Sequence, residues 1–248
     1  MKPAAKYGIA AAVVIVLLAA AGAFWFLRDD APDEVDLDTA VGSIADNTTT
    51  TAAGDTGADP AGGEISGTWT VDSETGEFDF ESATGTFAGF RIEEELAQIG
   101  ATTAVGRTGD VSGTVQIEGT TVTAADIEVD LTTITTDNSR RNSKVQEALD
   151  TAQFPTATFS LSEPIDLGEG AADGDQVSVT ATGDLTIHGV TKSVQIPMEA
   201  QLVDGTVVLV ASTEITFSDY DVEVPSAPVV VSVSDTGTLE MQLLLTKG

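Results

Sequence analysis

The chain has 248 residues, and its 10 Lys and Arg against 40 Asp and Glu give it a net charge of −30. A field of this sign repels nucleic acid and anionic lipid surfaces, which argues against a nucleic-acid-binding protein. The absence of cysteine excludes a disulfide framework, a thiol nucleophile and a thiolate metal site, and leaves the compartment open.

The first element in chain order is an uncharged apolar run, Tyr7–Leu27. Its length is close to the roughly 20 residues that a helix needs to cross a bilayer. Two lysines precede it, whereas two aspartates follow Arg28, so the positive-inside rule predicts a cytoplasmic N-terminus and an extracytoplasmic remainder. We therefore predict that residues 1–28 form a single-pass anchor in a cell membrane, in a bacterial envelope.

A cleaved signal peptide is the alternative for this run, because Ala21-Gly22-Ala23 forms a small-residue site. The run is long for the apolar part of a signal peptide, and Phe24-Trp25-Phe26 fits an interfacial aromatic belt. Both features favour the anchor. A lipoprotein is excluded, because there is no cysteine to carry the lipid.

Residues 29–66 are predicted to form a linker. They carry ten acids and no base, and most of the others are Thr, Ala and Gly. Sparse apolar surface and like-charge repulsion predict a disordered, extended segment. We expect it to hold residues 67–248, which suit one domain, away from the membrane.

From Gly67 onward, apolar and polar residues alternate with the period of two that is typical of half-buried strands. Phe78 and Phe80, for example, alternate with acids, and so do Ile127 and Val129. An antiparallel sheet curled around an apolar interior produces this pattern.

The clearest hairpin is centred on Gly183–Val194, which contains the only histidine of the chain, His188. Before His188, apolar residues occupy one face of the expected strand. After Gly189, the alternation of apolar and polar residues starts again. Gly189 supplies the backbone freedom for a tight turn. His188 is therefore expected at a hairpin tip, near the rim of whatever the strands enclose.

Two stretches have helical spacing. Phe90–Gly100 places Ile92, Leu96 and Ile99 on one helical face, although it also fits the beginning of a strand. Asn138–Ala152 is predicted to be a helix that Asn138 or Ser139 caps.

Several of these segments resemble the YceI-like domain family, a lipocalin-like barrel associated with polyisoprenoid binding. The resemblance covers roughly Gly67–Lys247. Asn142 follows Arg141 where the family usually has Asp. The matching segments, in order, are Thr68–Asp72, Gly106–Gly113, Ile134–Asp137 with Arg140-Arg141, Phe154–Phe159 and Gly183–Lys192.

The resemblance implies an all-β fold, an antiparallel eight-stranded lipocalin-like barrel with one or two short helices. The anchor and the linker precede this barrel in the chain. A barrel of eight strands can hold one slender ligand, here an isoprenoid-like or other long-chain lipid. A packed core is the alternative use of the same apolar residues. The candidates to line the interior are Phe80, Phe90, Phe154, Phe159 and Phe217.

His188 has three possible roles: a hydrogen bond within its turn, contact with a ligand head group, or chemistry. Catalysis would need a nucleophile and an orienting carboxylate within reach, and a metal site would need further ligands. The sequence offers no G-x-S-x-G element and no second histidine. No catalytic residue, metal or cofactor is predicted.

Arg140, Arg141 and Lys144 are three of the seven bases that follow residue 66. They can bind a phosphate head group, or they can form ion pairs with Asp137, Glu147 or Asp150.

The expected function is a membrane-tethered lipid-binding module. The alternative is a structural or interaction domain of the envelope with a filled core. The oligomeric state is not predicted.

Overall fold

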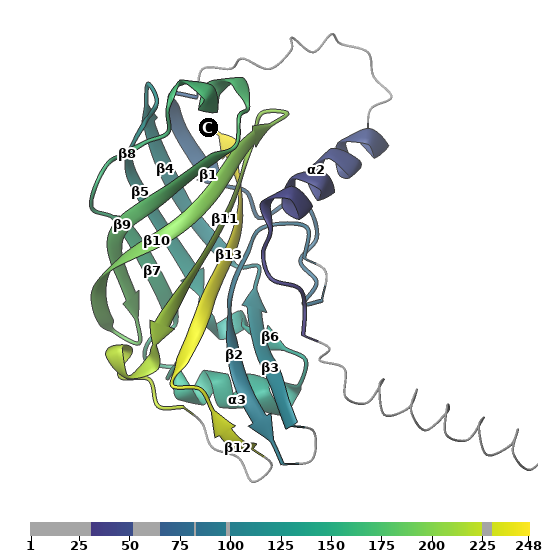
Figure 1. Cartoon of the computed structure of the whole chain (residues 1–248), viewed down its shortest axis with the longest axis vertical. Coiled ribbons are helices and arrows are strands. Elements are labelled where there is room, and N and C mark those ends of the chain that lie inside the picture. The colour runs from purple at the N-terminus through teal and green to yellow at the C-terminus, as the bar shows by residue number, and fades with distance from the viewer. Residues whose placement is uncertain (1–30, 52–64, 82, 98–99, 225–229) are drawn as a thin grey trace, which may run out of the picture.

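The structure is a computed structural model that describes residues 31–51, 65–81, 83–97, 100–224 and 230–248, and the side chains of residues 45–51 are not described (Figure 1). Eight antiparallel strands close into a barrel, in the order β1-β4-β5-β7-β9-β10-β11-β13, and β13 pairs with β1 to complete the ring. This confirms the predicted fold class. The strands of the ring are β1 (Gly67–Val71), β4 (Val111–Glu118), β5 (Thr121–Asp130), β7 (Thr156–Leu161), β9 (Val177–Ile187), β10 (Val190–Val203), β11 (Thr206–Thr216) and β13 (Thr236–Lys247).

The wall divides at β13. The last residues of this strand pair with β1, whereas Thr238–Gln242 pair with β2. A second branch of the sheet, β2-β3-β6, starts there, and β12 pairs with β2 while β8 pairs with β5. These strands are β2 (Phe87–Leu96), β3 (Gly100–Thr108), β6 (Thr135–Thr136), β8 (Ile165–Asp166) and β12 (Val230–Val233).

The two ends of the barrel differ. Helix α3 (Ser139–Ala148), β12 and the 3₁₀ turn η3 (Phe217–Tyr220) lie at one end, which we call the α3 end (Figure 1). The C-terminus and the 3₁₀ turn η2 (Glu169–Asp173) lie at the other, the η2 end (Figure 1). A third such turn, η1 (Leu131–Thr133), follows β5.

The helix predicted over Asn138–Ala152 is confirmed as α3, with Asn138 as its N-cap. The Asn138 side chain accepts a hydrogen bond from the Arg140 backbone N–H at 2.9 Å. The helical alternative for Phe90–Gly100 is wrong, because this stretch supplies most of β2 and pairs with β3 and β13. Ile92 and Leu96 are four apart, and this spacing also puts both on one face of a strand.

The strand predicted from Phe78 and Phe80 is also wrong. Both residues lie between β1 and β2, outside any strand. The chain turns here instead, because the Asp72 carboxylate accepts hydrogen bonds from the Glu74 and Thr75 backbone N–H groups at 2.8 and 3.0 Å. Such a local side-chain bond offers the backbone an alternative to a sheet ladder.

The disorder predicted for residues 29–66 is wrong for helix α2 (Leu37–Thr51), which packs on the outer wall of the barrel (Figure 1). The apolar residues of this segment are few, but they share one helical face that the barrel covers. Leu37, Ala40 and Ile44 are buried against residues of β11 and β13, namely Val208, Val210 and Leu244. The Asp36 carboxylate caps the first turn, where it accepts a hydrogen bond from the Thr39 N–H at 2.9 Å.

A second contact holds the segment just before α2. The carbonyl oxygen of Asp33 accepts hydrogen bonds from Arg107 Nη2 at 2.7 Å and Arg91 Nη1 at 3.3 Å. We call this contact, together with the packing of α2, the N-terminal clamp. It fixes residues 33–44 on the barrel in place of the free tether that the sequence predicts.

Beneath the clamp lies a buried ion pair. Arg107 Nε is 2.7 Å from Glu240 Oε1, and the two side chains are 4% and 1% exposed. Arg91 Nη1 lies 3.5 Å from the other Glu240 oxygen. A Cβ at Gly89 would clash with the Gly106 carbonyl oxygen and would also meet Arg107 Cγ at 2.9 Å, so glycine allows β3 and Arg107 to approach closely here. The Arg107 guanidinium also stacks on the Phe87 ring, 4.6 Å from its centroid.

Within the described residues, no helix has both the length and the apolar character to cross a membrane. The predicted anchor, residues 1–28, lies outside that part of the chain.

Candidate ligand cavity

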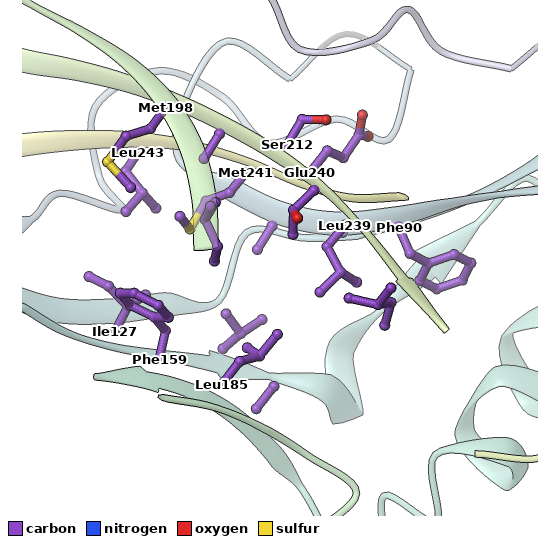
Figure 2. Close-up of a pocket in the computed structure, with 18 of the residues that line it drawn as sticks. Phe90, Ile127, Phe159, Leu185, Met198, Ser212, Leu239, Glu240, Met241 and Leu243 are labelled. Atoms are coloured by element: carbon purple, nitrogen blue, oxygen red, sulfur yellow. The ribbon is translucent and has the colours of Figure 1, made fainter. Parts of the chain in front are cut away.

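The barrel encloses a cavity of about 1110 Å³. Strands from around the whole ring line it, including β5 through Ile127, β7 through Phe159, β9 through Leu185 and β10 through Met198 (Figure 2). Most of the lining side chains are aliphatic or aromatic. The barrel therefore lacks the filled core that the alternative hypothesis requires.

The alternation seen in the sequence decides which residues face the cavity. Val177, Val179, Ala181, Leu185 and Ile187 of β9 all line it, as their shared face predicts. On β13, Leu239, Met241 and Leu243 line it. Glu240 also belongs to the lining, although its side chain is directed away from theirs (Figure 2). The outward residues of β13 instead meet α2 and the buried ion pair.

The cavity is lined mainly by buried residues at one end and by several exposed residues at the other. At the η2 end, its lining includes the buried residues Ile65, Trp69 and Ala171 and the exposed Asp175. The Trp69 indole N–H donates to the Ile65 carbonyl oxygen at 2.8 Å, so only the apolar part of the ring faces inward. At the α3 end, the lining includes Arg140, Ser143 and Lys144, whose side chains are exposed. The interior is therefore apolar, and most of the exposed polar lining residues lie at α3.

Three of the five predicted phenylalanines, Phe90, Phe159 and Phe217, line this cavity. Phe80 and Phe154 are absent from the lining that the described residues form. Phe80 lies in the connection before β2. Phe154 packs edge-on against the His188 ring, with centroids 4.8 Å apart, and its ring occupies the space where a Cβ on Gly189 would lie.

His188 lies at the β9–β10 turn, as predicted, and it is not among the lining residues. Its φ is +52° and that of Gly189 is +75°, which is the pattern of a type I′ turn. His188 Nδ1 donates to the Tyr220 carbonyl oxygen at 3.3 Å, so the geometry matches the turn-bonding role. Tyr220 itself lines the cavity, and burial, reinforced by the charge of Asp219, raises the pKa of its hydroxyl.

His188→Val is expected to lower the free energy of unfolding by about 1–2 kcal/mol, because a branched side chain is strained at positive φ. His188→Asn should cost less than His188→Val, since Asn tolerates this conformation. Urea denaturation measures both. Any lipid that native mass spectrometry detects with the unchanged protein should also be detected with both variants, and its loss from a stable His188→Asn protein would favour the head-group role instead.

The three bases of α3 all line the cavity, but two are already paired. Arg141 bonds to both Asp137 and the buried Glu94, and Lys144 Nζ lies 2.6 Å from Glu147 Oε2. The predicted alternative of ion pairing with Asp137 and Glu147 therefore describes Arg141 and Lys144. Among the described residues, the Arg140 guanidinium has no ion-pair partner and remains available to an anionic group.

Glu94 was not anticipated from the sequence. It lies on β2, whose residues Phe90, Ile92 and Leu96 also line the cavity. The period of two through these residues is the signal that places Glu94 inward, although the neighbouring Glu93 and Glu95 make the run look like a solvated face. Its bond to Arg141 links the cavity wall to α3.

Asn142 has a structural role. Its side-chain oxygen accepts hydrogen bonds from the Thr136 backbone N–H at 2.8 Å and from the Thr136 hydroxyl at 2.6 Å. An Asp carboxylate would accept the same two bonds. The substitution noted in the sequence thus leaves the link between β6 and α3 intact.

Comparisons with known proteins agree with this architecture. The family model of the YceI-like domain matches residues 64–245. A UPF0312 protein of Shewanella denitrificans is 28% identical over 152 residues, which are 57% of this chain and 76% of that protein. A UPF0312 protein of Shewanella baltica is 30% identical over 113 residues, 44% of this chain and 56% of that protein. The chain thus matches between about half and three quarters of the length of these relatives.

Two solved structures share the fold. A polyisoprenoid binding domain from Saccharophagus degradans superposes with a TM-score of 0.55 at 19% identity, over 73% of this chain and 98% of that chain. BcnA of Burkholderia cenocepacia superposes with a TM-score of 0.51 at 18% identity, over 70% and 98% of the two chains. At these identities the likeness concerns the fold alone.

Proposed function

Because the chain belongs to the YceI-like domain family, we propose that its barrel is a non-catalytic binding module that holds an isoprenoid-like or other long amphiphilic lipid. The observation that carries the proposal is the cavity of about 1110 Å³ with its predominantly apolar lining. The Saccharophagus degradans domain of the same fold is a polyisoprenoid binding domain, which supports the choice of ligand class.

The size and chemistry of the cavity suit a long chain. Ligand pockets commonly have volumes of roughly 300–1,000 Å³, so the volume of this one lies slightly above that range. Each buried methylene contributes about 0.8 kcal/mol, and ten of them contribute about 8 kcal/mol, which corresponds to a dissociation constant near 1 μM before the costs of association. An apolar tail alone thus supplies useful affinity.

The polar opening at α3 favours an amphiphile over a plain hydrocarbon. A ligand whose tail lies among Leu185, Met198 and Leu243 keeps its head at the exposed end of the cavity, near Arg140. We further propose that the module is extracytoplasmic and that the apolar run Tyr7–Leu27 holds it in a cell membrane.

Native mass spectrometry of the purified full chain, in a detergent that preserves non-covalent complexes, tests the ligand. We expect a mass above that of the 248-residue chain, and we expect denaturation to release the difference as an organic-soluble lipid with a long hydrocarbon chain. A folded protein that carries no lipid, and takes up none when mixed with polyprenyl phosphate or a long-chain fatty acid, would refute the proposal.

A further inference from the structure

The α3 end of the cavity carries more negative than positive charge. Residues 93–95 of β2, residues 137–150 around α3 and η3 together hold seven acids against three bases. Lys192 adds a fourth base, 3.9 Å from Asp219. A phosphate or carboxylate head group at this end would therefore meet a repulsive field. The seven acids are Glu93, Glu94, Glu95, Asp137, Glu147, Asp150 and Asp219, and the three bases are Arg140, Arg141 and Lys144.

The bases of α3 compensate little of this charge. Two of the three are already paired with acids, which leaves Arg140 without an ion-pair partner in the described part of the chain. Glu94 belongs to the cavity wall, with its side chain 7% exposed, and it bonds to Arg141 through one carboxylate oxygen. The other oxygen has no hydrogen-bond partner among the described residues. An anionic head group would thus lie near a buried carboxylate, which an uncharged head group tolerates better.

Tyr220 is a buried polar residue at the same end of the cavity. It belongs to η3, lines the cavity and is 2% exposed. It shares a buried cluster with Leu185, Ile215 and Phe217, and its backbone carbonyl oxygen accepts the bond from His188 Nδ1. Both the ring and the main chain are therefore held in place. Within the described residues, the hydroxyl itself makes no hydrogen bond.

The Tyr220 hydroxyl reaches free space. Among the described residues, Glu240 Oε2 is the one side-chain nitrogen or oxygen that is fully covered and lacks a hydrogen bond, so the Tyr220 hydroxyl is not fully covered. The cavity is the space that this lining residue borders. Burial, reinforced by the charge of Asp219, raises the pKa of the hydroxyl, so it keeps its proton at neutral pH and can donate it to a ligand oxygen.

From the excess of acids, the Glu94 carboxylate in the wall and the unpartnered Tyr220 hydroxyl, we propose that the α3 end of the cavity receives an uncharged oxygen head group, such as the hydroxyl of a long-chain alcohol, and that Tyr220 donates a hydrogen bond to it. This inference rests on the proposed lipid-binding function. It goes further because it names the chemistry of the head group and the residue that recognises it.

Competition against tritiated geranylgeraniol, with the full chain at a fixed detergent concentration, tests the head group. Geranylgeraniol, geranylgeranyl phosphate and the hydrocarbon phytane have tails of similar length and serve as competitors. At about 50 mM salt we expect the phosphate to compete several-fold less well than the alcohol, and the difference should narrow at about 500 mM, because salt screens the repulsion. A phosphate that competes as well as the alcohol at both salt concentrations would overturn the uncharged head group.

Tyr220→Phe removes only the hydroxyl and tests the donor. Thermal denaturation should show a midpoint close to that of the unchanged protein, since the hydroxyl bonds to no described residue. The dissociation constant of geranylgeraniol should rise about three- to tenfold, the worth of one hydrogen bond, whereas that of phytane should stay the same. An equal loss for both ligands would mean that Tyr220 acts through packing alone, and this would overturn its role as a donor.

A pair of matched double variants tests the electrostatic part. Glu93→Gln/Glu95→Gln removes two exposed acids near the α3 end, and Glu169→Gln/Asp173→Asn removes two exposed acids in η2 as the far-end control. Both double variants change the net charge equally. At low salt the first should strengthen binding of geranylgeranyl phosphate about two- to fivefold and leave geranylgeraniol unchanged. The second should alter neither ligand, and an equal effect of the two would show that only the overall charge matters.

The inference and the proposed function fail in different ways. If tritiated geranylgeraniol does not bind and phytane and the phosphate do not bind either, the lipid-binding function fails and the head-group assignment fails with it. If all three ligands bind, and neither Tyr220→Phe nor Glu93→Gln/Glu95→Gln changes their affinities, the barrel binds lipid tails and the head-group assignment alone is wrong.

Discussion

Ala181→Trp is expected to abolish lipid binding. Ala181 is 1% exposed and lies in the middle of β9, among the residues that line the cavity. An indole at this position projects into the space that a lipid tail would occupy. In native mass spectrometry the lipid-bound species should disappear, and added polyprenyl phosphate should not restore it.

The matched control is the preceding residue. Thr180 is exposed and points to the opposite face of the same strand, so Thr180→Trp should bind lipid as the unchanged protein does. Overpacking a core costs about 1–3 kcal/mol, which makes a check of folding by thermal denaturation necessary. A folded Ala181→Trp protein that still carries lipid would place the ligand outside the barrel.

Arg107→Met should lower the free energy of unfolding by about 3–5 kcal/mol, because it leaves the carboxylate of Glu240 buried without its closest charge partner. The Glu240 side chain is 1% exposed, and one of its oxygens has no hydrogen-bond partner even when Arg107 is present. Urea denaturation, followed by tryptophan fluorescence, measures the loss.

Two further variants make this test specific. Arg140→Met removes an exposed arginine and should change stability by less than about 0.5 kcal/mol. The double variant Arg107→Met/Glu240→Leu removes both charges and should recover most of the stability that Arg107→Met loses, since an apolar pair can replace a buried ion pair at little cost. If the double variant is no more stable than Arg107→Met, the loss comes from packing rather than from the unpaired charge.

Much of the fold follows from the sequence, because the inner face of the barrel wall is apolar and successive side chains of a strand point to opposite faces. The inward residues of β9, such as Val179 and Leu185, could be predicted from this alternation alone. The hairpin at His188 and the cap at Asn138 could also be predicted, since both depend on local backbone geometry.

What could not be predicted depends on contacts between distant segments. Phe80 and Phe154 have the same chemistry as Phe159, and only the tertiary fold decides which rings reach the cavity. Leu37 finds its partners on β11 and β13, some 170 residues or more away in sequence, so no local pattern shows that α2 is ordered.

The same holds for the buried charges. Glu240 pairs with Arg107, 133 residues away, and Glu94 meets Arg141 across 47 residues. Each of these acids occupies a strand position that would suit a solvated face equally well. The alternation along β2 indicates only the inward side of Glu94, and its partner Arg141 is known only once α3 is placed. The burial of Glu240 depends on the clamp that covers it.

The division of the wall at β13 has a consequence for biogenesis. Thr236–Lys247 supplies the pairings to β1, β2 and β11, so the ring has an open seam until this strand has been synthesised. Contacts over such long sequence separations form slowly. A chain that lacks β13 would therefore leave the apolar lining of the cavity exposed to solvent, and a ligand can be enclosed only after this strand has joined the ring.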